Sequence, residues 1–257
     1  MCCAAGLCAL ALGSDTLGSV RVPASDCGVV GFKAGFGVVF GRGSVTCGYS
    51  LDHIGPLTRS LRDVRVVMPA MGLVAGLCAE ARSGAPRPAI QNPRWVVAPD
   101  IQVAGADPKV VLAYERAGLL MVEADLLVEH AADWRAQPAN FSPELSRLLR
   151  YAEQQSASAY ASAARVVAQA HVEAARWFGR GDVMLLPSAP QTAFRFDAAV
   201  PAKQADFTGL ANMAGIPALS APLPVLSGTL PIGLQCIAPA GGAATLLNLN
   251  LQGICTT

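Results

Sequence analysis

The sequence is poor in charged residues, in aromatic residues and in histidine. Charged residues make up 14% of the 257 residues, against about 25% in typical globular proteins. Aromatic residues make up 6%, and there are three histidines. The net charge of +1 gives no basis for binding nucleic acid or an acidic membrane surface. Hydrophobic residues account for 53%, which argues against a disordered chain and predicts a large buried core.

The sequence also lacks a long apolar run. The longest, residues 1–12, falls short of the roughly 18–20 residues that a membrane-spanning helix needs. It has no basic start and no convincing cleavage site, so it does not have the form of a signal peptide. We therefore expect no membrane segment.

Motifs for metals and nucleotides are missing as well. Eight cysteines are present, but no two have the C-x-x-C spacing of zinc ribbons or thioredoxin-like sites. Most lie in apolar surroundings, so we expect reduced thiols, a cytoplasmic location and no metal. The glycine pairs at 35–37 and 41–43 do not fit G-x-G-x-x-G, and there is no P-loop.

The segment from Gly13 to Ser25 combines glycines with hydroxyl residues, one acid and one base. Glycines allow sharp turns and leave main-chain N–H groups uncovered, and consecutive uncovered N–H groups form nests that bind negative charge. Ser19 places a hydroxyl beside such donors. A nucleophile next to oxyanion donors is the minimum equipment for acyl transfer.

This segment resembles the signature of the amidase signature family, whose pattern is roughly G-S-D-T-G-G-S-[IV]-R-x-P-A. Residues Gly13 to Ala24 match it everywhere except at Leu17, where the family has glycine. Several separated motifs in the family's order make the signal specific. The resemblance is weak over residues 73–140. The further matching segments are residues 27–33, 50–59, 185–187, 212–218 and 230–235.

The resemblance implies a serine hydrolase that cleaves carboxamide C–N bonds without a cofactor. It makes Ser19 the nucleophile and assigns oxyanion donors to the main chain of Thr16, Leu17, Gly18 and Ser19. A leucine at position 17 either reshapes the donor nest or occupies a position with an ordinary negative φ. The residues alone leave both alternatives open.

The family's mechanism uses two further groups, a lysine and a serine in a cis peptide, both N-terminal to the signature. Neither motif occurs in the sequence, so we expect a truncated chain with impaired activity. Lys33 is the nearest lysine, but it matches a structural position of the family and is a weak candidate base. His53 beside Asp52 suggests a Ser-His-Asp triad, yet adjacent residues of an extended segment point to opposite faces. We expect His53 to pack or to line the pocket.

Other charged residues receive weaker assignments. Asp15 and Arg21 flank the loop, and we expect them to support it through an ion pair or backbone hydrogen bonds. Asp206 corresponds to an acid that contacts glutamine in ammonia-transferring relatives; the alternative is a solvated loop carboxylate. His130 and His171 lie in polar helical contexts and are expected on the surface.

Residue patterns predict an α/β fold in one domain, residues 1–257. Residues 2–12 are rich in alanine and leucine and are expected to form a short buried helix. Ser60 and Asp63 have the form of a capping box, and Pro69 should kink or end the helix that follows. Pro108 should begin a helix that ends before Gly118. Strands are expected at 94–98, 183–186, 217–224 and 231–238, and short strands or bends at 29–39 and 42–46. Residues 140–179 are expected to be rich in helix, and residues 81–93 to form a surface connection.

By resemblance, the strands form a mixed sheet flanked by helices on both faces, incomplete at both termini. The predicted function is amidase-type hydrolysis of a small amide. The alternatives are a glutaminase similar to the A subunit of the glutamyl-tRNA amidotransferase, and an inactive remnant or scaffold. Incomplete ends would expose apolar surface, so we also expect association or a homodimer.

Overall fold

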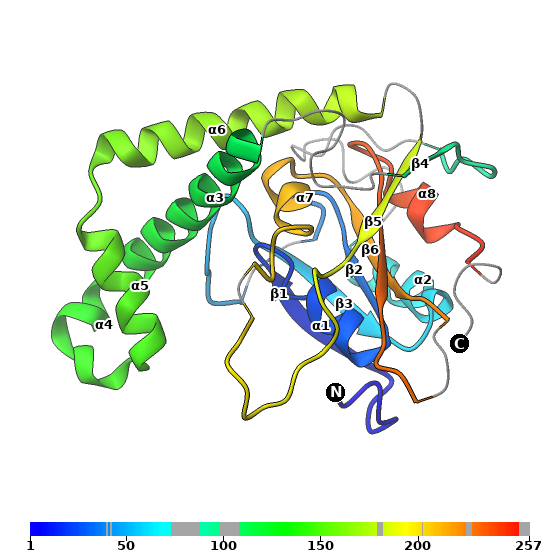
Figure 1. Ribbon diagram of the computed structural model, residues 1–257, viewed down its shortest axis with the longest axis horizontal. Helices are drawn as coiled ribbons and strands as arrows, with labels where there is room; N and C mark the ends of the chain where they lie inside the picture. Colours follow the sequence, from blue (N-terminus) through cyan, green and yellow to red (C-terminus); the bar gives the residue numbers. More distant parts are fainter. Residues whose placement is uncertain are drawn as a thin grey trace.

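The structure is a computed structural model that describes residues 1–39, 41, 43–72, 88–97, 108–178, 182–201, 203–224 and 228–251. Figure 1 shows a twisted sheet with helices on both sides and a helical lobe extending from one end. The described strands form one sheet in the order β1-β3-β2-β6-β7-β5-β4. Neighbouring strands are antiparallel except β4 and β5, which are parallel. The strands are β1 Leu10–Asp15, β2 Val30–Lys33, β3 His53–Thr58, β4 Trp95–Val97, β5 Val183–Pro187, β6 Ala218–Pro222 and β7 Gly233–Ile237.

The described helices range from one turn to six turns. A short 3-10 helix, Pro138–Asn140, separates two of them. The α-helices are α1 Arg21–Cys27, α2 Leu61–Ala70, α3 Pro108–Glu129, α4 Ala131–Ala136, α5 Pro143–Glu153, α6 Ala157–Trp177, α7 Gly209–Met213 and α8 Ala243–Leu247.

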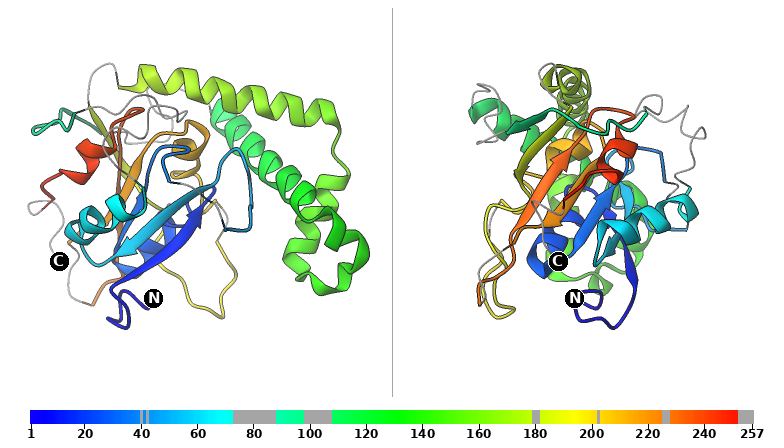
Figure 2. Two further views of the ribbon diagram at one scale, coloured as in Figure 1. Left: turned by 180° about the vertical axis from the view of Figure 1, so that it is seen from behind. Right: turned by 90° about the vertical axis from the view of Figure 1, so that its right-hand side faces the viewer.

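Alternating side chains divide the sheet between two apolar clusters. Phe32, Leu219 and Cys236 pack with residues of α2 and α8 on one face. Ala218 and Ile237 pack with residues of α6 and α7 on the other, where α1 also lies against β2, β6 and β7. Figure 2 shows these layers from the back and from the side. The predicted α/β architecture, a mixed sheet with helices on both faces, is confirmed.

The helical lobe has an apolar core of its own. Helix α3 packs along α6 and α5, and Met121, Trp134 and Leu149 belong to one buried cluster between them. The same cluster includes Leu51 and Met213, so it connects the lobe to the sheet side of the molecule (Figures 1 and 2). That all 257 residues form one domain stays a prediction.

The predicted helix at residues 2–12 is wrong. Residues 2–6 form turns, and Leu10–Asp15 is an edge strand that pairs antiparallel with β3. Leu12 is 59% exposed, so the segment is not buried either. Alanine and leucine favour helix only weakly, and the ladder with β3, which is distant in the sequence, overrides that preference.

The predicted end of the helix that begins at Pro108 is also wrong. Helix α3 continues through Gly118 to Glu129. A Cβ atom at Gly118 would lie 3.2 Å from Met213 Sδ and 3.4 Å from Leu17 Cδ2. The glycine therefore lets α3 approach α7 and the Leu17 side chain closely and does not end the helix.

Several other local predictions are confirmed. The Ser60 hydroxyl accepts a hydrogen bond from the Asp63 N–H, and α2 ends one residue after Pro69. Strands occur at four of the predicted segments, and 140–179 contains all of α5 and α6. Val30–Lys33 is the strand within 29–39. The described residues of 42–46 contain no strand, and residue 44 is a bend. Residues 81–87 of the predicted connection and residue 42 lie outside the described residues. No helix in the described part of the chain is long and apolar enough to cross a membrane.

Candidate active site

The signature segment forms the turn from β1 to α1. Gly18 adopts a φ of +130°, a conformation that side chains disfavour, and a Cβ atom there would lie 2.0 Å from Thr208 Oγ1. Thr208 fills this space and donates a hydrogen bond of 2.6 Å to the Leu17 carbonyl. The Val22 N–H bonds to the Gly18 carbonyl at 2.8 Å and begins the helical turn. Glycine is therefore required at position 18, one residue before Ser19.

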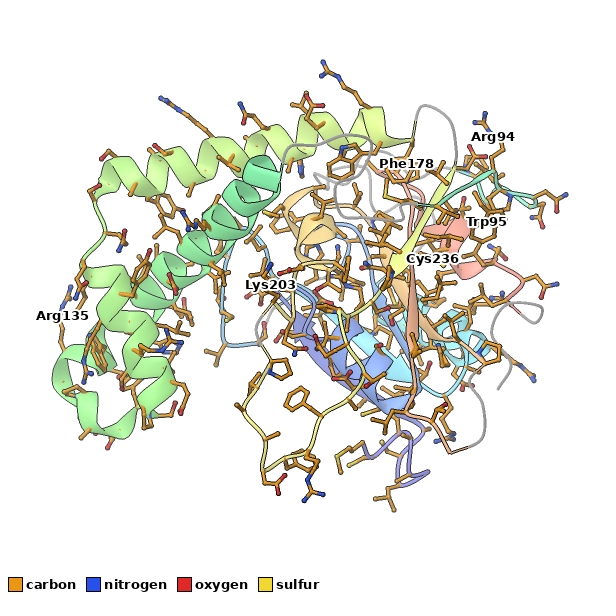
Figure 3. All side chains as sticks on the ribbon, in the orientation of Figure 1. Arg94, Trp95, Arg135, Phe178, Lys203 and Cys236 are labelled. Carbon is orange, nitrogen blue, oxygen red and sulfur yellow. The ribbon has the colours of Figure 1, made fainter. Side chains whose placement is uncertain are left out.

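Ser19 is exposed and lines a cavity of about 330 Å³. The cavity is mainly apolar, with three polar side chains among the residues that line it. Two of its residues follow Lys203, which Figure 3 labels on the segment before α7. The lining residues are Leu17, Gly18, Ser19, Val22, Pro23, Asp26, Phe194, Gln204 and Ala205.

The main-chain N–H groups around Ser19 are not used by the fold. Those of Thr16, Leu17, Gly18 and Ser19 make no hydrogen bond to another residue that the structure describes. The next N–H group, that of Val20, bonds to the Asp15 carboxylate at 3.3 Å. Four successive donors are thus left for an acceptor outside the described chain.

Leu17 is accommodated without backbone strain. Among the described residues, Lys203 is the one non-glycine with a positive φ, so Leu17 has an ordinary conformation. Its side chain packs on the apolar cluster of the helical lobe, near Gly118 and Gly209, and also lines the cavity. Of the two alternatives, the ordinary negative φ is the one observed.

A buried ion pair joins the two ends of the loop. Arg21 Nη2 and Asp15 Oδ1 are 2.9 Å apart, and Arg21 Nε donates to Asp15 Oδ2 at 2.9 Å. Both side chains are fully buried. Burial alone would raise the pKa of the Asp15 carboxyl, but the charge and hydrogen bonds of Arg21 outweigh it and the pKa is lowered. The end of β1 and the start of α1 are thereby fixed to each other.

Three residues distant in sequence complete the shell around Arg21. Arg21 Nη1 donates to the Thr208 carbonyl at 3.0 Å and to Gln235 Oε1 at 2.5 Å. Arg21 Nη2 also donates to Asn212 Oδ1, and Asn212 Nδ2 donates to Asp15 Oδ1 at 2.9 Å. Asn212 and Gln235 lie in segments that resemble the family's sequence, but local patterns gave them no role, because the contacts span about 190 residues or more.

Asp52 and His53 do not form part of a triad. Thr16 Oγ1 donates to Asp52 Oδ1 at 2.6 Å, and the Cys47 N–H donates to Asp52 Oδ2 at 2.8 Å. The buried His53 instead bonds to the Leu51 carbonyl through Nδ1, at 2.7 Å. Its Nε2 is buried without a partner among the described residues. Burial, reinforced by the charge of Lys33, lowers the pKa of His53 well below its usual value.

Lys33 is held in the core. Its Nζ donates to the Ile216 carbonyl at 2.7 Å and to the Ala34 carbonyl at 3.2 Å. Burial lowers the pKa of Lys33 well below its usual value, and the Arg21 charge lowers it further. Lys33 does not line the Ser19 cavity.

Asp206 and His171 are both partly exposed. Asp206 is partly exposed and lies 3.7 Å from Lys203 Nζ, outside the set of residues that line the cavity. His171, which was expected on the surface, is partly exposed. Its Nδ1 is 3.3 Å from the Met213 carbonyl and its Nε2 is buried, because α6 packs on α7.

The sequence matches the Amidase family over residues 2–76 and 102–247. This chain belongs to the amidase family. It is 33% identical to the A subunit of the glutamyl-tRNA(Gln) amidotransferase of Thermus thermophilus, over 96% of this chain and 64% of that protein. It is 29% identical to the protein of the same name from Desulforapulum autotrophicum, over 91% and 61%. This amidase chain thus spans less than two thirds of the length of these relatives.

Solved structures show the same amidase fold. One, from work on a vestigial protein complex that reveals the evolutionary origins of an s-triazine catabolic enzyme, has a TM-score of 0.83 at 26% identity. The match covers 99% of this chain and 65% of that one. The A subunit of the glutamyl-tRNA(Gln) amidotransferase of Thermotoga maritima has a TM-score of 0.67 at 26% identity, over 96% and 62%. Within the described residues, no cluster of His, Cys, Asp or Glu could hold a metal ion.

Proposed function

We propose that this amidase-family chain hydrolyses carboxamide C–N bonds with Ser19 as its nucleophile. The observation that carries the proposal is the pairing of an exposed Ser19 hydroxyl, in an apolar cavity, with the N–H groups of residues 16–19, which bond to none of the described residues. In the family's signature the serine at this position is the nucleophile. The buried Asp15–Arg21 pair supports the role by fixing both ends of the loop.

The proposed reaction proceeds through an acyl-enzyme. Ser19 Oγ forms a bond to the amide carbonyl carbon and loses its proton to solvent water, while the carbonyl oxygen becomes an oxyanion. Main-chain N–H groups of Thr16, Leu17, Gly18 and Ser19 stabilise that oxyanion; one such donor contributes about 2.7–4 kcal/mol to the transition state. The C–N bond then breaks, the nitrogen takes up a proton and leaves, and water hydrolyses the ester on Ser19.

Proton transfer is the slow step of the proposed reaction. No lysine or histidine is among the described residues that line the Ser19 cavity, and Lys33 is bonded to two core carbonyls. An amine leaving group needs a proton, whereas a nitrophenolate leaves without one. We therefore propose that the chain by itself cleaves amides slowly but transfers the acyl group of an activated ester readily.

Comparing an ester with an amide tests this proposal. We expect 4-nitrophenyl butyrate to give a burst of nitrophenolate that Ser19→Ala abolishes, with butanamide turning over far more slowly. Ser14→Ala is the matched control, because Ser14 is also exposed and lies in the same signature but outside the cavity. Ester hydrolysis that survives Ser19→Ala would overturn the proposed nucleophile. Silence toward both substrates would favour the inactive remnant.

A second candidate is the glutaminase of an amidotransferase. It is favoured by the relatives that are named as the A subunit of a glutamyl-tRNA(Gln) amidotransferase. A protein of this kind would use L-glutamine as its amide, with Asp206 as a contact, and would bind a second protein chain. Release of glutamate from L-glutamine, together with a copurifying partner chain, would support this candidate. A lone chain or a homodimer that is inactive toward L-glutamine would speak against it.

The location of the protein is also a proposal. The six cysteines that the structure describes are free thiols, although Cys3 Sγ and Cys8 Sγ lie only 3.4 Å apart. Reduced thiols at this distance fit a reducing, cytoplasmic compartment. Mass spectrometry of the protein from cells, with thiols blocked at lysis, would show a Cys3–Cys8 disulfide if the compartment were oxidising.

A further inference from the structure

Asp26 brings a carboxylate into the same cavity as Ser19. Ser19, Val22, Pro23 and Asp26 all line the cavity. Within α1, spacings of four and three residues place Val22 and Pro23 on the same side of the helix as Asp26. Ser19 lies two residues before the first residue of α1, and Asp26 lies in the last turn of the helix. The wall of the cavity thus carries a nucleophile, Ser19, and a negative charge, Asp26.

The Asp26 carboxylate has no partner among the described residues of the protein. Its Oδ1 is buried and makes no hydrogen bond to any of them. Burial raises the pKa of Asp26, and no neighbouring cation in the described part of the chain opposes the rise. Lys203, the cation nearest in sequence to the lining residues Gln204 and Ala205, is 3.7 Å from Asp206 instead. An unpaired, partly buried carboxylate is unfavourable unless something binds it.

The rest of the cavity wall separates the two polar ends. Leu17, Val22, Pro23, Phe194 and Ala205 supply apolar surface, with the Gln204 amide as the remaining polar side chain. A ligand complementary to this cavity carries a carbonyl group at one end, an apolar middle and a hydrogen-bond donor or cation at the other.

We propose that Asp26 selects amides with an ammonium group at the end of a short aliphatic chain. The inference rests on the proposed function, because it places the reacting carbonyl at Ser19. It adds the substrate class: the ammonium N–H groups donate to the Asp26 carboxylate while the methylene groups lie on the apolar wall. Asp26 is a specificity residue here and takes no part in bond making.

Binding measurements separate this inference from catalysis. In the full chain carrying Ser19→Ala, which cannot form the acyl-enzyme, calorimetry would compare 5-aminopentanamide with hexanamide, its neutral counterpart of equal length. We expect the cation to bind about tenfold more tightly, as a charge-assisted hydrogen bond allows. Adding Asp26→Asn should reduce the ratio to about one while hexanamide binding stays within about twofold. Asp26→Glu should retain the preference.

The outcomes are distinguishable. Equal affinities for the two amides, or a preference that survives Asp26→Asn in a folded variant, would overturn the inference. So would loss of hexanamide turnover in Asp26→Asn with intact Ser19, because Asp26 would then act in the chemistry. A cation preference in the Ser19→Ala chain without any Ser19-dependent turnover in the wild type would establish the ammonium site and refute the proposed catalysis.

Discussion

Asp15 and Arg21 form an ion pair of 2.9 Å with both side chains fully buried, one at the end of β1 and the other at the start of α1. The loop that carries Ser19 lies between them. The guanidinium also bonds to groups on α7, β7 and the residue before α7. The position of Ser19 therefore depends on contacts between segments that are distant in the sequence.

Removing Arg21 should strongly destabilise the protein. Arg21→Ala leaves a buried, uncompensated carboxylate at Asp15, and we expect a loss of about 3–5 kcal/mol in the free energy of unfolding, measured in urea. Arg94→Ala is the control, because the Arg94–Asp182 pair is of similar length but Arg94 is 67% exposed; little change is expected. Equal effects of the two substitutions would contradict the structural role of the buried pair.

The same pair should make stability depend on acid pH. The native pKa of Asp15 is lowered, so its contribution is present above the ordinary pKa and is lost as pH falls below it. We compare wild type with Asp15→Asn, which removes the titrating carboxyl group. The gap in unfolding free energy should narrow by about 1 kcal/mol between about pH 7 and about pH 3. A gap independent of pH would rule out a lowered pKa.

The buried Lys33 should make the stability of the protein depend on alkaline pH. Its native pKa is well below the ordinary value, so the unfolded chain binds more protons and stability rises with pH toward the ordinary pKa. Relative to Lys33→Met, wild type should gain up to about 1.4 kcal/mol per pH unit between about pH 9 and about pH 10. Chemical unfolding at several pH values measures this, and parallel curves for the two proteins would be inconsistent with a neutral buried lysine.

Gly18 provides a steric test of the loop. Gly18→Ala combines a disfavoured φ with a Cβ atom only 2.0 Å from Thr208 Oγ1. Gly43→Ala has a similarly unfavourable φ of +90° but open space around its Cβ. In both variants we expect the unfavourable φ to lower the free energy of unfolding by about 1 kcal/mol. Gly18→Ala alone should lose further stability and Ser19 reactivity. Similar behaviour of both variants would show that the contact with Thr208 is unimportant.

The loop that carries Ser19 could be predicted from the sequence, but not all of the residues that contact it could. The signature motif contains Ser19, Asp15 and Arg21, and the ion pair between Asp15 and Arg21 could be predicted because their spacing is local. The helix cap at Ser60 was equally predictable, since a capping hydrogen bond spans three residues. The strand at Leu10–Asp15 was mistaken for a helix because its partner β3 is distant in the chain.

Roles that depend on tertiary contacts were not accessible in the same way. Asn212 and Gln235 reach Arg21 across about 190 and 214 residues, and no local pattern encodes such a contact. Asp26 is different, because its seven-residue spacing from Ser19 is visible in the sequence. Only the fold shows that this side of α1 lines a cavity and that the carboxylate has no partner there among the described residues.

The most direct test is covalent labelling of the nucleophile. The intact chain is treated with a fluorophosphonate, digested and analysed by mass spectrometry, with Ser19→Ala and Ser14→Ala in parallel. We predict a phosphonyl adduct on Ser19 in wild type and in Ser14→Ala, and no adduct at this loop in Ser19→Ala. An unlabelled Ser19 in folded wild-type protein, or an adduct that persists after Ser19→Ala, would contradict the account.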